Sequence, residues 1–340
     1  MLQKIKNYIH RRYIDSPKQK RERIIALDLL RGLFLGVIFI NHLAWSPSLF
    51  TFLTGSSHLA ASAAEGFFTI SGLLVGYIYG PKILKNTKQT FLKLLKRAGW
   101  LYLLSIFFTI LYTLMVLPVG PDYMRTYVDF NQQFTSIFDY LYKVLTFQFI
   151  FGWADFLARY SLFMLFAPLA LWFIAKKHAW LVVIISVATW LTLSPESTDL
   201  FRPWVIIFYI SILIGYYLPE IEYQARKIFT KKYSRAIGYL LLALALVTYL
   251  VSTVATTVFP FILDSHTFTF SQPITDFITT TVSVNQTLQN GVFSRELMGI
   301  GRLLIGILWF WSLYIVFRKY EQKIDSITRG SLFLLGTNSL

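Results

Sequence analysis

The chain has 340 residues, of which 55% are hydrophobic and 18% aromatic, while only 14% are charged. Soluble domains carry about a quarter charged residues, so this composition excludes most soluble enzymes and disordered proteins. The chain contains no cysteine, which excludes disulfides, thiolate metal sites and a cysteine nucleophile. The formal net charge of +15 would suit a nucleic-acid-binding protein, but the placement of the charges argues for a membrane protein.

Eight apolar runs approach or reach the length of about 17–25 helical residues that crosses a bilayer. They cover residues 24–45, 60–80, 98–117, 156–175, 179–193, 204–218, 236–259 and 298–317. The fifth and sixth runs are short. We therefore expect an all-α integral membrane protein, a polytopic bundle of about eight complete transmembrane helices. Residues 1–23 would form a basic cytoplasmic segment and residues 24–340 a single transmembrane domain.

The lysines and arginines lie mostly in alternate connections between these runs. The stretches that hold 25 of the 32 cations are residues 1–23, 81–97, 176–178, 219–235 and 318–330. Because cytoplasmic loops are enriched in Lys and Arg, this asymmetry places the N-terminus in the cytoplasm and supports the number of spans. The prediction is a multi-pass protein of the cell (inner) membrane, embedded in the lipid bilayer and with no nucleic-acid partner.

Two further apolar segments are not expected to span. The segment 137–153 carries Asp139 and Lys143, and counting it as a span would move the lysines after residue 175 to the outer side. We interpret it as an interfacial or re-entrant helix on the outer side. The run at 331–340 is too short to span, so either it begins a truncated C-terminal span or it is a short interfacial piece.

Ionisable side chains inside membrane spans are costly and are functional candidates by default. The first span contains Asp28, Arg31 and His42. Arg31 and His42 are separated by about three helical turns, which puts them on nearly the same face, about 16 Å apart along the axis. Asp28 precedes Arg31 at a spacing that allows an ion pair.

His42 is the one histidine of the five that belongs to a predicted span. Imidazole is the side chain best suited to accept and return a proton near neutral pH. Two plainer interpretations stay open: the Asp28–Arg31 pair stabilises a helix end near the headgroups, and His42 is an ordinary interfacial histidine.

The second span supplies Glu65, followed by Ser71 and Gly72. His42 ends the first span and Glu65 lies in the outer third of the second, so we expect an antiparallel pair of helices to bring them to similar depth. A carboxylate that orients an imidazole makes a competent base. Ser71 and Gly72 either contact a ligand or only permit close helix packing, as small residues do in membranes.

Several cations lie near the outer or middle level of the membrane, where the charge rule makes them rare. The candidates for substrate binding are Asp155, Arg159, Arg202 and Arg302. A negatively charged or polyhydroxy substrate would explain these cations and the nearby Arg295, and lipid phosphate would do so equally well. The outer connection 259–294 is rich in Thr, Ser, Asn and Gln, so it either binds sugars or forms a polar cap.

The first span resembles that of membrane O-acyltransferases of the acyltransferase-3 superfamily. The resemblance rests on residues 27–32 (LDLLRG), followed by His42. Residues 40–42 (INH) and 63–72 (AAEGFFTISG) are most similar to the OpgC (glucan succinyltransferase) branch. Weaker similarity covers most of the remaining chain, although the branch often has glutamine where this chain has residues 206–208. Members have about ten spans, so the last part would be missing here.

The resemblance implies transfer of an acyl group, from cytoplasmic acyl-CoA to a hydroxyl of an envelope polysaccharide or oligosaccharide outside. Succinyl-CoA or acetyl-CoA would be the co-substrate, and no metal is implied. By position, His42 would be the general base and Glu65 its partner, while Arg31, with Asp28 and Ser71, would contact the acyl donor. A succinyl group would also give the outer arginines a purpose.

Two other classes of function stay open. A transporter or flippase of an anionic or acylated glycan intermediate would also use buried charges, but no internal repeat and no pair of Gly/Pro-broken spans is visible. A non-catalytic membrane scaffold would leave the charges inside the spans without a purpose.

Overall fold

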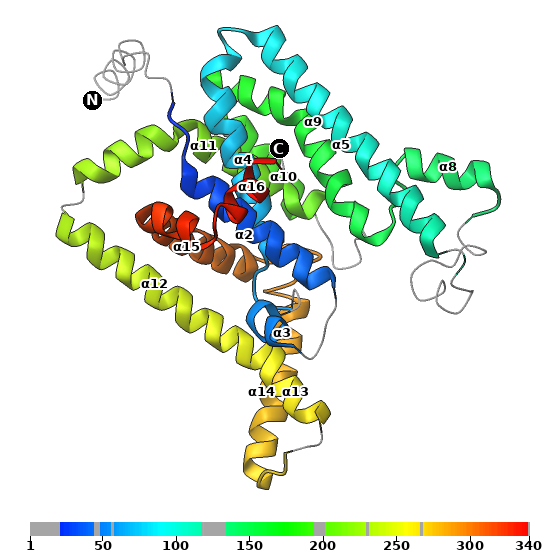
Figure 1. The fold of residues 1–340 in the computed structure, drawn as a ribbon, viewed down its shortest axis with the longest axis vertical. Coiled ribbons are helices and arrows are strands. Elements are labelled where there is room, and N and C mark those ends of the chain that lie inside the picture. Colours follow the sequence, from blue (N-terminus) through cyan, green and yellow to red (C-terminus); the bar gives the residue numbers. More distant parts are fainter. Residues whose placement is uncertain are drawn as a thin grey trace.

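The computed structural model describes residues 21–43, 48–55, 58–116, 118, 134–192, 201–228, 231–265 and 268–338. Most of the basic N-terminal segment and much of the connection between the third and fourth predicted spans lie outside these residues. Most residues in the described ranges are helical, and these ranges contain no strand (Figure 1).

Thirteen α-helices, one short 3₁₀ helix (η3) and one π-helix (η4) make up the described elements. In chain order they are α2 (Ile25–His42), α3 (Leu49–Thr54), α4 (Ala63–Ile83), α5 (Thr87–Val116), α8 (Ile137–Leu145), η3 (Gly152–Ala154), α9 (Asp155–Ala175), α10 (Ala179–Leu191), α11 (Arg202–Ile228), α12 (Lys231–Thr253), η4 (Val254–Val258), α13 (Phe259–Ser265), α14 (Gln272–Asn290), α15 (Ile300–Ile327) and α16 (Ser331–Asn338).

All eight predicted spans contain a helix, but six helical segments within the described residues have both the length and the composition to cross a membrane. The other two are α4 and α10. Helix α10 has 13 residues, about 20 Å, which is shorter than the bilayer core of about 30 Å. Helix α4 has 21 residues, but its glycines, tyrosines and Glu65 lower its hydropathy. The fold is thus an all-α polytopic membrane protein, and six of the helices within the described residues meet both criteria for a span.

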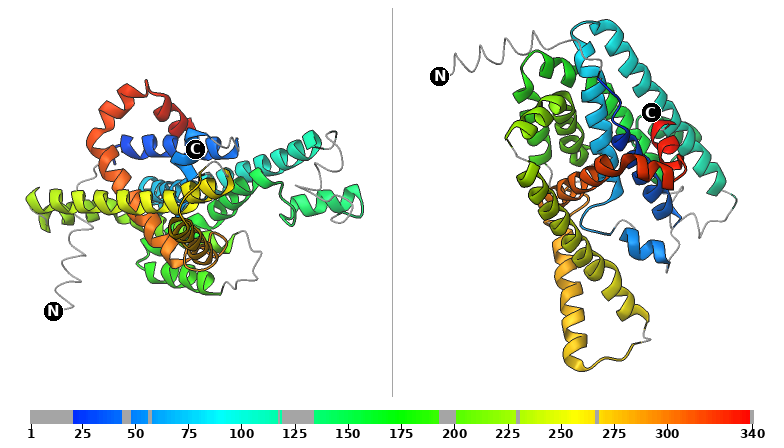
Figure 2. Two further views of the ribbon diagram at one scale, coloured as in Figure 1. Left: turned by 90° about the horizontal axis from the view of Figure 1, so that it is seen from below. Right: turned by 60° about the vertical axis from the view of Figure 1, so that its left-hand side comes forward.

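The two segments that were not expected to span form short helices. Helix α8 has 9 residues and lies at the edge of the bundle beside α5 (Figure 1). The last helix, α16, packs across α2, and the two run side by side in the views of Figure 2. This contact is close: a Cβ added to Gly32 would meet the carbonyl of Leu332, and one added to Gly336 would meet the carbonyl of Asp28.

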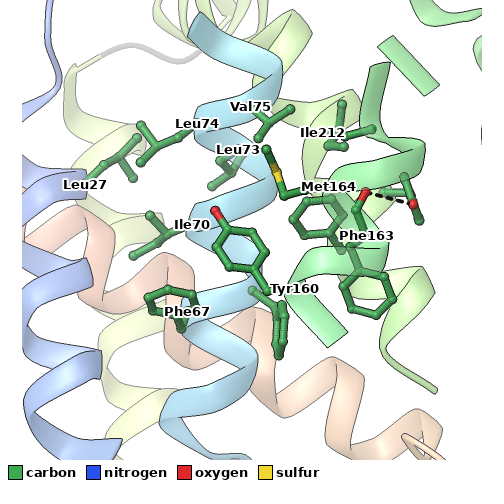
Figure 3. Packing of buried hydrophobic residues seen from close by; sticks show 14 of the residues in the cluster. Leu27, Phe67, Ile70, Leu73, Leu74, Val75, Tyr160, Phe163, Met164 and Ile212 are labelled. Carbon is green, nitrogen blue, oxygen red and sulfur yellow. Dashed lines mark hydrogen bonds between the residues drawn. The ribbon is translucent and has the colours of Figure 1, made fainter. Parts of the chain in front are cut away.

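Helix α4 occupies the centre of the bundle and contacts α2, α5, α9 and α11. Figure 3 shows its side chains Phe67, Ile70 and Leu73 between Leu27 of α2 and the aromatic residues of α9. Because protein rather than lipid surrounds α4, it does not need the hydropathy of a lipid-facing span. Thirteen of its residues are buried.

Glycines set the contact between α4 and α11. A Cβ at Gly76 would meet the backbone carbonyl of Ile212, and a Cβ at Gly215 would meet that of Leu73. Small residues allow helix backbones to approach closely in membranes, where lipid tails are as apolar as leucine and burial alone does not drive association. The backbone contact therefore depends on the absence of side chains at these two positions.

We expect Gly76→Ala to destabilise the protein by about 1–3 kcal/mol, because the added methyl group forces α4 and α11 apart. Gly99→Ala on α5 is the matched control, since a Cβ there has no neighbour within 4 Å and alanine favours the helix by up to about 1 kcal/mol. Thermal unfolding of the two purified variants in detergent measures the difference. Equal melting temperatures would contradict the assigned helix contact.

Candidate functional site

A buried ion pair joins the first turn of α4 to the first turn of α15. Nε of Arg302 donates to Oε1 of Glu65 at 2.5 Å, and the two residues are 1% and 3% exposed. The other carboxylate oxygen accepts from the backbone N–H of Ser62 at 2.8 Å and from the Ser62 hydroxyl. Ser62 and Glu65 form the capping box that starts α4, so the local sequence itself fixes this carboxylate.

Arg302 is held by further contacts on two sides. Its Nη1 lies 3.3 Å from the carbonyl of Leu59 and 3.5 Å from that of Phe293. The backbone around Leu59 is fixed in turn, because the N–H of Ala60 donates to the hydroxyl of Ser252 on α12. Among the described residues, Nη2 of Arg302 has no hydrogen-bond partner although it is buried. Burying such a donor is costly, so this nitrogen is placed to bind water or a ligand.

Arg302 also lines a cavity of about 570 Å³. We call it the α14 cavity, because α14 supplies more of its wall than any other element. Its lining residues are His58, Ala255, Thr256, Pro260, Val282, Asn285, Gln286, Gln289, Asn290, Arg295, Glu296 and Arg302. The cavity therefore collects amides from α14, the imidazole of His58, a carboxylate and a guanidinium from the α14–α15 connection, and the guanidinium of Arg302 from α15.

Helix packing sets the depth of Glu65 relative to α2. A Cβ added to Gly66 would meet the ring of Phe34, and the guanidinium of Arg31 lies 5.3 Å from the ring centroid of Phe67. The start of α4 is therefore level with the middle of α2. His42 lies about 12 Å further along the α2 axis than Phe34.

His42 occupies the last turn of α2 and is exposed. Its Nδ1 is 2.6 Å from the carbonyl of Ile38, and because a carbonyl only accepts, Nδ1 must donate. This contact makes Nε2 the acceptor nitrogen of the neutral ring. In the described structure the Glu65 carboxylate bonds to Arg302 and Ser62, so the partnership of His42 with Glu65 stays a prediction.

A second set of cations surrounds Tyr160 on the other side of α4. Arg97 donates from Nη2 to the Tyr160 hydroxyl at 2.9 Å, and its guanidinium lies 5.5 Å from the ring centroid. Arg31 is fully buried and lies close enough to Arg97 for their charges to repel. We call Arg31, Arg97, Tyr160 and Phe67 the Arg31 cluster.

The sequence did not single out Arg97, because it was grouped with the basic residues of the connection 81–97. Its one signal is position: it is the last cation before the apolar run of α5. The sequence also suggested Arg31 as a partner for Asp28. Nε of Arg23 donates to the Asp28 carboxylate at 2.7 Å, and Asp28 also attracts the Arg31 charge. Asp28 therefore faces two cations, one of which belongs to the cluster.

The remaining predicted site residues fall in two places. Arg159 donates to Asp155 at 2.6 Å, as the spacing suggested, and its guanidinium lies 5.2 Å from the ring centroid of Trp204. Arg202 is half-buried at the start of α11, two residues before that tryptophan. Ser71 is fully buried beside the close contact of α4 with α11, which fits the helix-packing interpretation; its role in donor binding stays a prediction.

The residues that the structure describes hold no group of three or more His, Cys, Asp or Glu side chains that could bind a metal ion. The charged groups of the site are the ion pairs Glu65–Arg302 and Asp155–Arg159 and the guanidinium groups of the Arg31 cluster.

These features define a polytopic helical membrane protein with a charged, partly hollow site inside its bundle. Residues 23–340 match the family described as OpgC protein, and the chain belongs to this family. It is therefore an enzyme of the acyltransferase type that OpgC proteins represent, in a membrane setting. Comparisons with curated proteins and with solved structures gave no significant match.

We expect Glu65→Gln to destabilise the protein by about 3–5 kcal/mol, because it leaves the Arg302 charge buried without its counterion. A double variant, Glu65→Leu with Arg302→Met, should regain part of that loss, since it removes both charges. The control is Glu321→Gln, which breaks the exposed pair with Arg318 and should cost at most about 1 kcal/mol. Denaturant or thermal unfolding in detergent measures all three, and a double variant no more stable than Glu65→Gln would contradict the pairing.

Proposed function

We propose that this protein is a membrane O-acyltransferase that moves a succinyl or acetyl group from cytoplasmic acyl-CoA to a hydroxyl of an extracytoplasmic envelope glycan. The observation that carries this proposal is the family match over nearly the whole chain. The arrangement of charges agrees with it, because acyl transfer across a bilayer needs polar groups on both sides of a sealed core.

The Arg31 cluster is our candidate for the donor side. Arg97 ends the basic connection 81–97, which the charge rule assigns to the cytoplasm. Acyl-CoA carries phosphates, and guanidinium groups bind phosphate and thioester-side oxygens through charge-assisted hydrogen bonds. Arg31 lies inside the first span, whereas Arg97 directly precedes the third. The two guanidinium groups lie close together, so they are suited to binding neighbouring oxygens of a donor that enters from the cytoplasm.

His42 is our candidate for the general base. In this mechanism Nε2 of the imidazole takes the proton of the glycan hydroxyl, while the hydroxyl oxygen attacks the thioester carbonyl carbon. The carbon–sulfur bond breaks, and the CoA thiolate leaves with the electron pair and takes up a proton. Glu65 is proposed as the partner that orients and charges this imidazole, the role that the family resemblance implies for it. Asp155, Arg159 and Arg202 would contact the acceptor or a succinyl carboxylate.

We expect His42→Ala to lower the rate of acyl transfer about 10²–10⁴-fold, the usual loss when a general base is removed. The assay measures transfer from labelled succinyl-CoA or acetyl-CoA to a glucan by purified protein. His178→Ala is the matched control, because His178 is an exposed histidine in the short α9–α10 connection. Unchanged transfer by His42→Ala would refute its role as base. Glucan movement without acyl-CoA consumption would favour the transporter.

We expect Arg97→Ala to raise the KM for acyl-CoA about tenfold while leaving kcat nearly unchanged, because one charge-assisted hydrogen bond is worth about 1.5–3 kcal/mol. Lys96→Ala is the control: it removes an exposed cation from the neighbouring position. Steady-state kinetics at varied acyl-CoA concentration gives KM and kcat separately for each variant. Equal KM values for the variants would mean that Arg97 does not contact the donor.

A further inference from the structure

Helix α14 carries an apolar stripe beside a face of amide side chains. The stripe includes the exposed residues Ile274, Phe277, Val284 and Leu288, which recur at helical spacing. The amide residues 285, 286, 289 and 290 recur along the neighbouring face and line the α14 cavity. A helix with an exposed apolar stripe next to an amide face is suited to lying between lipid and a hydrated chamber.

The elements that precede α14 also contribute to the cavity. Helices α12 and α13, with η4 between them, give a span candidate of 33 residues, about 50 Å, which exceeds the bilayer core of about 30 Å. Figure 2 shows the far end of this segment and α14 extending as a hairpin beyond the rest of the bundle. The π-helix η4 contributes Ala255 and Thr256 to the cavity wall, and such segments often occur at functional sites.

The cavity leads inward to a buried hydrogen-bond donor. Its floor is Arg302, whose Nη2 is unpartnered among the described residues while the side chain is 1% exposed. Its walls are tied together, since Nε2 of Gln289 donates to the carbonyl of His58 at 3.4 Å. Because Glu65 is level with the middle of α2, the floor lies deep within the bundle. Irregular backbone at such depth is tolerated where it lines a water-filled cavity.

The charge inside the cavity is nearly balanced. Arg302 is neutralised by Glu65, and the walls carry one more cation, Arg295, and one carboxylate, Glu296. Four amide side chains supply both donors and acceptors, which matches a ligand with many hydroxyl groups. The volume of about 570 Å³ lies within the range of small-molecule sites, about 300–1,000 Å³.

We propose that the α14 cavity is the binding site for the acceptor, an uncharged segment of a sugar chain, with Nη2 of Arg302 donating to one of its oxygens. This inference rests on the proposed function, because it names the place where that reaction receives its glycan. It also gives the cavity amides a role in sugar binding, whereas the sequence left their segment as either a sugar-binding loop or a polar cap.

The test measures binding and transfer separately. Purified protein in nanodiscs is titrated with a neutral glucan oligosaccharide and, in parallel, with succinate, using isothermal calorimetry. The variants are Asn285→Ala with Gln289→Ala, which removes two amides, and Asn285→Trp, which fills the cavity. Gln272→Ala is the matched control, because Gln272 is exposed at the other end of the same helix and pairs with Asp276.

We expect the double alanine variant to bind the glucan about tenfold more weakly, since each neutral hydrogen bond contributes about 0.5–1.5 kcal/mol. Asn285→Trp should abolish binding, and Gln272→Ala should bind as the wild type does. Equal glucan affinity in all variants would overturn the assignment. Absence of glucan binding to the wild type, or binding of succinate alone, would also overturn it.

Acyl transfer from labelled succinyl-CoA and acetyl-CoA to the same glucan distinguishes this inference from the proposed function. If the wild type transfers the acyl group and the cavity variants have the same KM for glucan as the wild type, the proposed reaction is supported and the α14 cavity is not the acceptor site. If glucan binding depends on the cavity but neither donor reacts, the site stands and the proposed reaction is wrong.

Discussion

The ion pair of Glu65 with Arg302 is the contact on which the organisation of the site depends. It joins the start of α4 to the start of α15, so two connections that would otherwise lie at the membrane surface are drawn into the bundle. A buried pair of this kind is costly to form and more costly to break, because either charge alone would be left without compensation. Ser62, Leu59 and Phe293 supply the remaining hydrogen bonds that make the pair tolerable.

The sequence predicts well those features that depend on neighbours along the chain. The helical class, the helices within all eight apolar runs and the non-spanning segment at α8 follow from hydropathy and charge alone. The Asp155–Arg159 pair follows from its i, i+4 spacing. The capping box at Ser62 and Glu65 is also a local pattern. In each case the information lies in a local spacing or in the composition of a continuous segment.

Features that depend on how distant helices meet were not predictable in this way. Glu65 and Arg302 are 237 positions apart, and no spacing rule relates them. The expected equal depth of His42 and Glu65 assumed that both spans begin and end at the same level. The structure aligns Gly66 with Phe34 instead. Because glycine has no side chain, the phenylalanine ring can lie against the start of α4, and this places Glu65 level with the middle of α2. Likewise, the hydrogen bond of Arg23 to Asp28 comes from a residue outside the helix, and the spacing of Asp28 and Arg31 gave no indication of it.

The same register explains how one central helix could serve chemistry that crosses a membrane. The first turns of α4 carry Glu65, which pairs with Arg302 of the cavity wall, and Phe67, which contacts Arg31 and Tyr160. These two residues are separated by only about 3 Å along the helix axis. The polar path from the α14 cavity and the cation cluster on the other side therefore approach each other at one level, near the middle of α2. A thin apolar layer of aromatic side chains, rather than the full thickness of the bilayer, then separates them. The apolar layer that separates the two polar regions is therefore thin at this level. The rest of the bundle supplies the thickness that keeps the membrane closed.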